Sequence, residues 1–141
     1  MKFPNPESGG RKDALRHAYW MALISNKIGP KRALWLGYAH EKAGKKDFEK
    51  GIEEDGSLAD QTAMQMDLIN NSFGVKVGKY CYECDQQKLL ETVLESLKKG
   101  ELKIIKQNSK GDFLDEDNEI IPTDSWKGRW ENERVLINSG F

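Results

Sequence analysis

Apolar residues recur at helical spacing through most of the first hundred residues. In residues 11–28 no Gly or Pro interrupts this pattern until Gly29 and Pro30, which predicts one helix that ends there and another that begins at once. We expect the second helix over residues 30–44, so that the two form a tight hairpin. Residues 45–56 are charged and punctuated by glycine, which predicts a loop containing one amphipathic turn.

Two further helices are predicted before residue 100. Residues 57–60, Ser-Leu-Ala-Asp, resemble a capping box and open a third helical run that continues through Phe73. Asp85 is a candidate N-cap for a fourth helix over residues 86–99, whose leucines and valine form a regular apolar stripe. Glycines weaken the end of the third run and end the fourth, at Gly74, Gly78 and Gly100.

The pattern changes after residue 100. Residues 102–106 have strand character, residues 108–111 are typical of a turn, and residues 120–121 supply a short partner strand, so we expect a small hairpin. The tail, residues 123–141, holds two tryptophans and a Val-Leu-Ile run, and is expected to pack back onto the helices. The predicted fold class is therefore mainly α, a four-helix core with a small C-terminal β-hairpin and an irregular tail.

Size and composition restrict the class of protein. The 141 residues are enough for one domain, with a helical core over about residues 11–99 and the hairpin and tail over about 101–141. No apolar run approaches the ~20 residues that a membrane-spanning helix needs. The net charge is −1 and the pI is about 6.2, which disfavours nucleic-acid binding as the main task. The oligomeric state stays open.

The N-terminal residues bear on localisation. They contain no apolar signal segment, which predicts a cytoplasmic protein if the chain is taken as written. The abrupt Pro-rich opening also resembles the cut end of a larger protein, in which case export by upstream domains and a secreted location are expected. Whether Met1 is the natural start is left open.

The predicted first helix carries polar chemistry on one face. Its apolar residues cover most of its circumference, which is typical of a central, largely buried helix. One face nevertheless combines an acid, a guanidinium, an imidazole and an indole, at spacings of three and four residues: Asp13, Arg16, His17 and Trp20. Burying such groups is costly unless each meets a partner or a bound ion. We therefore expect partners from neighbouring helices.

Two other helices offer those partners. His40 and Glu41 project from a stripe of small residues on the second helix, while Asp67, Asn70 and Asn71 share a face of the third. Helical bundles build sites from the inward residues of facing helices in this way. The coincidence of these groups favours a functional polar site, and a satisfied structural network is the alternative.

Three other motifs carry less weight. Cys81 and Cys84 have the spacing of a metal knuckle or redox motif, but a structural zinc needs four ligands, so we expect two reduced cysteines near a helix end. The acidic residues 112–119 lack the Gly and Glu of a calcium loop, which favours a solvated turn. Trp126 and Trp130 could form a binding platform, although aromatic core packing is commoner.

Three segments together resemble a known family. They are Asp13-Ala-Leu-Arg16-His17-Ala-Tyr-Trp20, Ala39-His40-Glu41 and Met66-Asp67-Leu-Ile-Asn70-Asn71-Ser-Phe-Gly74. Their pattern is similar to that of an uncharacterised family of bacterial domains, often found at the C-terminal end of long secreted or polymorphic-toxin-like proteins. The resemblance covers about residues 8–78. It implies a helical core with converging motif residues, a toxin-type effector role and, for a toxin, an immunity protein as partner. The family often has His where this chain has Ile69.

The leading hypothesis is a hydrolase in which activated water attacks a phosphoryl or acyl centre, because no Ser or Cys has the context of a nucleophile. The predicted catalytic residues are His17, His40, Glu41, Asp67 and Arg16, with Glu41 as general base and Arg16 neutralising developing negative charge. Substrate binding is assigned to Asp13, Trp20, Asn70 and Asn71. A divalent metal ion would be held by His17, His40 and Asp67.

Two alternatives accompany this hypothesis. A metal-free version uses His17 as the base, oriented by Asp13 or Asp67. A different class of function is a non-catalytic protein-binding module, in which the polar cluster is structural and the segment from Trp126 to Trp130 contacts the partner. The resemblance implies a bacterial envelope component as the substrate of the hydrolase.

Overall fold

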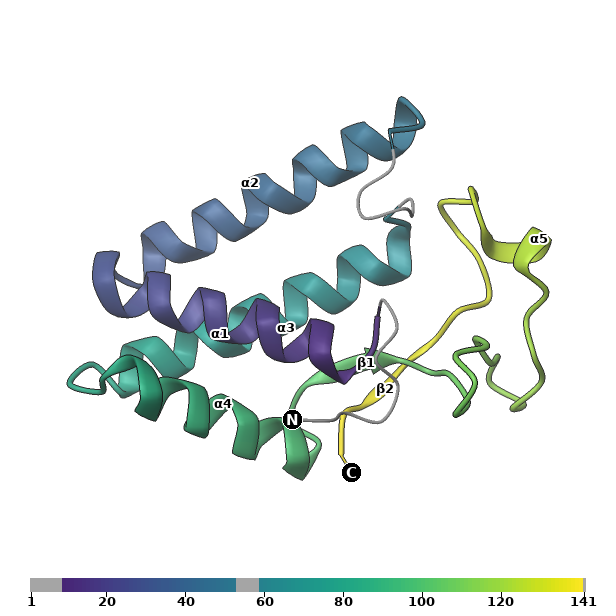
Figure 1. Ribbon diagram of the computed structural model, residues 1–141. Coiled ribbons are helices and arrows are strands. Elements are labelled where there is room, and N and C mark those ends of the chain that lie inside the picture. The colour runs from purple at the N-terminus through teal and green to yellow at the C-terminus, as the bar shows by residue number, and fades with distance from the viewer. Residues whose placement is uncertain (1–8, 53–58, 141) are drawn as a thin grey trace.

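The computed structural model describes residues 9–52 and 59–140, which form a helical bundle beside a small pair of strands (Figure 1). In chain order the elements are α1 (Arg11–Ile28), α2 (Pro30–Glu49), α3 (Gln61–Tyr80), α4 (Gln86–Lys99), β1 (Lys103–Ile105), α5 (Thr123–Trp126) and β2 (Leu136–Asn138). The predicted fold class, a mainly helical chain with four packed helices and a small antiparallel sheet, is confirmed. In the described ranges, none of the helices combines the length and the apolar character needed to cross a membrane.

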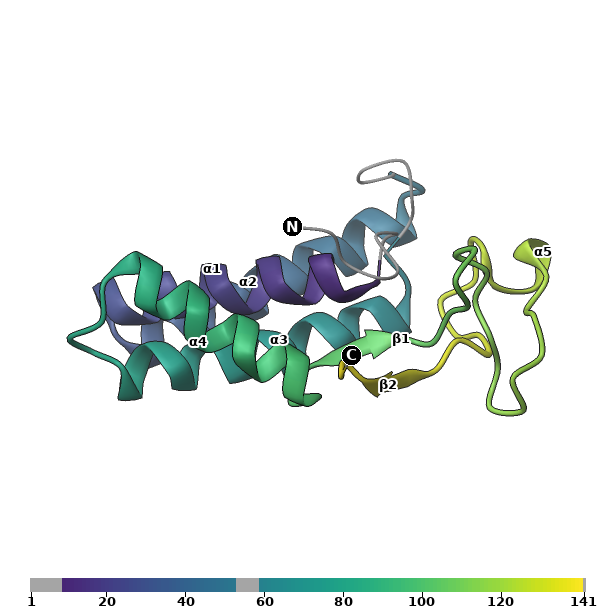
Figure 2. The ribbon, with the colours of Figure 1, turned by 60° about the horizontal axis from the view of Figure 1, so that its bottom comes forward.

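Helix α1 is central, as its apolar circumference predicted. It packs against α2, α3, α4 and β1, whereas α2 packs mainly against α1 and α3 (Figures 1 and 2). The predicted stripe of α4 faces the core, where Leu89, Val93 and Leu97 are at most 1% exposed. Burial of three such side chains contributes about 1.5–3 kcal/mol each, which fixes α4 against α1.

Small residues set the distance between α1 and α3. Ala14, Ala18 and Ala22 of α1 are fully buried, and a Cβ placed on Gly74 would lie 2.9 Å from the carbonyl carbon of Ala18. A Cβ on Gly78 would likewise meet the Ala22 carbonyl oxygen. The sequence suggested that these two glycines weaken the end of α3, and the structure shows that they do not. They let the two backbones touch, and the packing keeps α3 helical to Tyr80.

The second helix is longer than predicted. Instead of ending at Gly44, α2 continues to Glu49, through residues that were assigned to a loop. Packing outweighs the low helix propensity of Gly44, because Phe48 in the last turn contacts the Trp130 ring at a centroid distance of 5.2 Å. Ser57 of the predicted capping box lies outside the described residues. The N-cap of α3 is Asp60, which accepts a hydrogen bond from the Ala63 amide.

The strand pairing differs from the predicted hairpin. β1 pairs antiparallel with β2, with Ile104 opposite Ile137. Ile120, expected to belong to the partner strand, makes only an isolated bridge to Leu114. The chain favours the distant partner because Ser139 links β2 to the core, through bonds from its hydroxyl to Leu97 and from its backbone N–H to Leu102. The turn over residues 108–111 is confirmed, since the Asn108 side chain accepts two backbone N–H bonds there.

The tail packs back onto the helices, as predicted. The Arg134 guanidinium forms an ion pair of 2.6 Å with Asp60 and lies 4.5 Å from the ring centroids of Phe113 and Trp126. Gln61 donates its backbone N–H to the Trp130 carbonyl. Trp126 and Trp130 are thus held by internal contacts, in agreement with the packing interpretation.

Candidate functional site

Three helices bring ionisable side chains to one place. Asp13 and His17 lie one turn apart on α1, and Asp67 of α3 faces them. His17 Nε2 is 3.6 Å from Asp13 Oδ1 and 3.5 Å from Asp67 Oδ1. All three side chains are half-buried, with 17–20% of their surface exposed. The convergence expected from the sequence is therefore present for these residues, which we call the Asp-His-Asp cluster.

The cluster has the dimensions of a metal-ligand group. One nitrogen or oxygen from each of the three residues lies within 4.8 Å of the others. Imidazole and carboxylate are ligands for zinc and other divalent transition ions. Asp13 is also an anchor for the start of α1, because its carboxylate accepts the Gly9 backbone N–H. These three residues are therefore a group that could hold a divalent cation.

Glu41 of α2 adds a second buried acid next to Asp67. Its exposed fraction is 6%. Burial, followed by the charges of Glu41 and Asp13 and a hydrogen bond with Glu41, raises the pKa of Asp67 to about 9. The Arg16 charge acts in the opposite direction and does not compensate. At neutral pH the two carboxyl groups therefore share a proton, as close carboxyl pairs do.

His17 is kept in its neutral form. Burial lowers the pKa of its imidazole, and the interactions with Arg16 and His40 act in the same direction, while Asp13 and Asn71 oppose them. A neutral imidazole has a lone pair for a metal ion or a proton. Both uses predicted for His17 are chemically available in this environment.

The remaining predicted site residues divide into a rim and a structural set. Arg16, 57% exposed in its side chain, pairs with Asp13 at 3.1 Å. Trp20 and His40 are exposed as well, and among the described residues His40 does not join the metal-ligand group. These three side chains are therefore exposed to solvent and lie outside the metal-ligand group.

Asn70 and Asn71 point in different directions, although the sequence placed them on one face. The Asn70 side chain donates to the Lys103 carbonyl and accepts the Lys103 N–H, both at 2.9 Å, and so joins α3 to β1. Asn71 is buried beside Gly37 of α2, where a Cβ would lie 3.1 Å from its amide nitrogen. Asn70 therefore lies outside the cluster, and Asn71 lies where α2 packs against α3.

The sequence placed His40 and Glu41 in the site together with Asp67, whereas the structure buries Glu41 and leaves His40 exposed. The available signal was the stripe of small residues on α2, since Ala33, Gly37 and Glu41 are all buried. A charged residue in register with Ala and Gly, at spacings of four, belongs to the inward face. That register could have indicated that Glu41 is buried and His40 is not.

The cysteine pair also differs from the prediction. Cys81 and Cys84, expected to be reduced, form a disulfide. Helix α3 ends at Tyr80, and the turn that follows brings the two Cα atoms to 5.2 Å, within the range for a disulfide. The acidic residues 112–119 do form a turn, in which Asp115 accepts the backbone N–H groups of Asp117 and Glu119.

Comparison with known proteins assigns a family but no activity. The chain belongs to the family described as "Domain of unknown function (DUF6973)", whose model matches residues 1–101. The match includes α1 to α4 and therefore every residue of the cluster, while β1, α5 and β2 follow it. No curated protein and no solved structure matches the chain.

Proposed function

We propose that this protein is a hydrolase that uses activated water, with a divalent metal ion held by Asp13, His17 and Asp67. The observation that carries the proposal is the approach of three ligand atoms to within 4.8 Å of one another, next to a buried acid. A bound divalent ion would lower the pKa of a coordinated water toward neutrality. The substrate would carry a phosphoryl or acyl centre.

The other side chains supply binding and proton transfer. Glu41 shares a proton with Asp67, so this pair can accept or release a proton without leaving a second buried charge. Metal ligands must be deprotonated, and cation binding is therefore expected to release that proton. Arg16 at the rim would neutralise an anionic substrate group as negative charge develops.

Metal binding tests the ligand assignment. Chelator-treated protein is titrated with Zn²⁺ and with Mn²⁺ in a calorimeter, and one site per chain is expected. His17→Ala and Asp67→Asn should lower the affinity at least about tenfold, because even the outer partners of ligands contribute that much. His40→Ala is the matched control, since it removes an exposed imidazole outside the ligand group. The affinity of this variant for the metal ion should stay unchanged.

Turnover tests the reaction class. With the bound ion present, the wild-type protein is assayed on bis(p-nitrophenyl) phosphate and on p-nitrophenyl acetate. His17→Ala and Asp67→Asn should lose activity without a fall in melting temperature. Wild-type protein without a metal site and without turnover of either ester would contradict the proposal.

We further propose an exported effector that acts on a bacterial envelope component and is neutralised by an immunity protein. The Cys81–Cys84 disulfide supports an oxidising compartment, because thiols are kept reduced in the cytoplasm. Wild type and His17→Ala are expressed in the cytoplasm and in the envelope compartment of a bacterium. Growth should be inhibited only by the wild type in the envelope, and equal tolerance of both proteins in both compartments would contradict an effector role.

The second candidate is a binding module whose polar cluster is structural. It is favoured by the bonds that Asp13 already makes to the Gly9 N–H and to Arg16. In that case His17→Ala and Asp67→Asn should lower the free energy of unfolding by several kcal/mol, as broken buried networks do. Thermal unfolding of the two variants therefore separates the candidates.

A further inference from the structure

A second surface of the molecule, separate from the Asp-His-Asp cluster, is unusually apolar. Five large hydrophobic side chains at the end of α1 and on the first half of α2 are 41–68% exposed: Ile28, Leu34, Trp35, Leu36 and Tyr38. We call these residues the α2 apolar surface. Exposed apolar groups that gather in this way mark interaction sites more often than scattered ones do.

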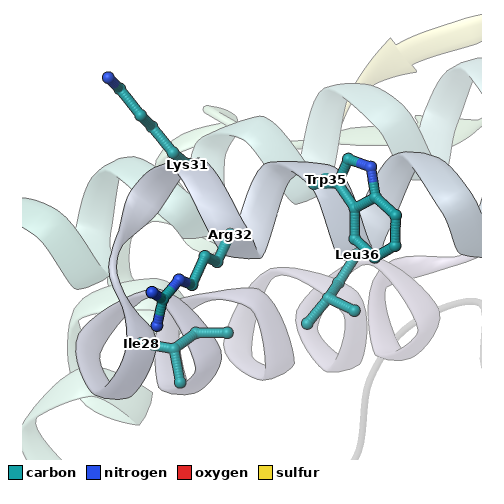
Figure 3. A pocket seen from close by; sticks show the side chains of 5 residues that line it. All are labelled: Ile28, Lys31, Arg32, Trp35 and Leu36. Atoms are coloured by element: carbon teal, nitrogen blue, oxygen red, sulfur yellow. The ribbon is translucent and has the colours of Figure 1, made fainter.

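Part of this surface is hollowed (Figure 3). A shallow groove with a volume of about 390 Å³ is lined by Ile28, Lys31, Arg32, Trp35 and Leu36. The Arg32 side chain extends over Ile28 at the α1–α2 junction, and the Trp35 ring stands beside Leu36, while Lys31 points away into solvent. Apolar and cationic side chains therefore alternate along one edge of α2.

The charge around this surface has one sign. Residues 27–40 contain Lys27, Lys31 and Arg32 but no Asp or Glu, although the whole chain has a net charge of −1. All three cations are exposed. A binding partner of this region must accept apolar side chains and positive charge together, which an anionic lipid surface does.

The spread of the apolar groups distinguishes a bilayer from a folded protein. At about 100° per residue, Leu34, Trp35 and Leu36 span roughly 200° of the helix circumference, and Tyr38 falls between the first two. A rigid partner contacts one narrower stripe of a helix, as coiled coils and groove-bound helices do. A fluid headgroup region can enclose a helix over a much wider angle. Tryptophan and tyrosine are also the residues enriched at that depth.

The geometry points to a membrane-docking surface: the α2 apolar surface, with Lys27, Lys31 and Arg32, binds the interface of an anionic phospholipid bilayer. The position of α2 agrees with this use, because it packs on α1 and α3 along one side and its opposite side is open (Figures 1 and 2). The docking surface makes no use of the cluster residues. The outcome of a membrane-binding test is therefore independent of the proposed hydrolase activity.

Vesicle co-sedimentation tests this assignment. The full chain is mixed with vesicles of phosphatidylglycerol and phosphatidylcholine in equal parts, and with vesicles of phosphatidylcholine alone. We expect binding to the anionic vesicles that weakens as salt is raised. Lys31→Ala combined with Arg32→Ala should lower the partition constant at least about tenfold, since each cation near an anionic surface contributes about fivefold. Trp35→Ala should lower it as well.

Controls match each change outside the surface. Lys88→Ala combined with Lys98→Ala removes two exposed cations from α4, and Ile120→Ala removes an exposed apolar side chain from the tail. Both should bind like the wild type, and Asp67→Asn should too. Equal binding to both vesicle types, no binding to either, or an unchanged partition constant for the Lys31 and Arg32 variant would overturn the assignment. A stable dimer in solution that Trp35→Ala dissociates would also overturn it, in favour of a second copy.

Discussion

Two carboxylates seven residues apart, one at the N-cap of α3 and one within α3, have opposite surroundings. Asp60 is 2% exposed and accepts bonds from Arg134 at 2.6 and 3.0 Å, from Asn132 at 2.8 Å and from the Ala63 N–H at 2.9 Å. Asp67 lies next to Glu41 and Asp13, and the nearest guanidinium, Arg16, is mostly exposed. The first acid has its countercharge within the fold, whereas the second has other acids as its neighbours.

This difference separates a structural ion pair from a candidate site. A buried pair with full hydrogen bonding is costly to break but has no use for a further cation. A group of acids around one imidazole is held in the folded protein only by keeping a proton or by binding a positive ion. The arrangement around Asp67 is therefore the one that a ligand can change.

The largest effect is expected from Arg134→Ala. It leaves the Asp60 carboxylate buried without its cation, so the free energy of unfolding should fall by about 3–5 kcal/mol in urea denaturation. Arg16→Ala is the control next to the cluster, because the exposed pair of Arg16 with Asp13 contributes at most about 1 kcal/mol. Equal losses in the two variants would contradict the distinction between the two acids.

A smaller effect is expected from Gly74→Ala. This residue lies where α3 packs against α1, the two helices that bear the cluster residues. Its methyl group meets the Ala18 carbonyl, so α1 and α3 must separate, at a cost of about 1–3 kcal/mol. Gly44→Ala is the matched control. Among the described residues nothing lies within 4 Å of a Cβ added at Gly44, and the variant should stabilise α2 by about 0.5–1 kcal/mol. Metal affinity should fall only in the Gly74 variant. Stabilisation of the protein by both changes would rule out the close contact of Gly74 with Ala18.

The pH dependence of stability, measured in chelator, is a change of slope and not a single loss of stability. Folded Asp67 keeps its proton up to about pH 9, whereas in the unfolded chain an aspartate loses it near the ordinary value of 3.8. Its contribution to stability is therefore complete below pH 3.8 and is lost as pH rises toward 9. The slope is at most about 1.4 kcal/mol per pH unit, since one proton is involved.

Asp67→Asn should remove this alkaline loss, because an amide resembles the protonated acid and does not titrate. The comparison of wild type and variant by chemical denaturation between pH 5 and pH 9 isolates the contribution. Parallel pH profiles for the two proteins would mean that Asp67 and Glu41 do not share a proton in the folded state.

Helix boundaries were predictable where the local signal was strong. The bounds of α1 and α4 agree with the sequence prediction, because Gly29 with Pro30 and Asp85 with Gly100 mark the ends locally. The errors at Gly44 and in the partner of β1 come from tertiary contacts. Phe48 against Trp130, and Ser139 against Leu97, join residues far apart in the sequence, and no local pattern reports such contacts.

The candidate site was predictable in part for a similar reason. Spacing of three and four residues placed Asp13, His17 and Asp67 on inward faces, which the structure brings together. The same rule could not separate Asn70 from Asn71, since neighbouring residues differ by only about 100° around a helix. Which of them met β1 depended on where the strand lay.

The contact of Gly74 with Ala18 has a consequence for anyone who wishes to re-engineer the protein. Where α1 and α3 meet at Ala18 and Gly74, the contact is made by main chain, so a larger side chain there forces the two helices apart. The approach of α2 is different, because a Cβ on Gly37 would meet the side chains of Met21 and Asn71 and not main chain. Libraries aimed at new selectivity should therefore vary that helix and leave the other two untouched.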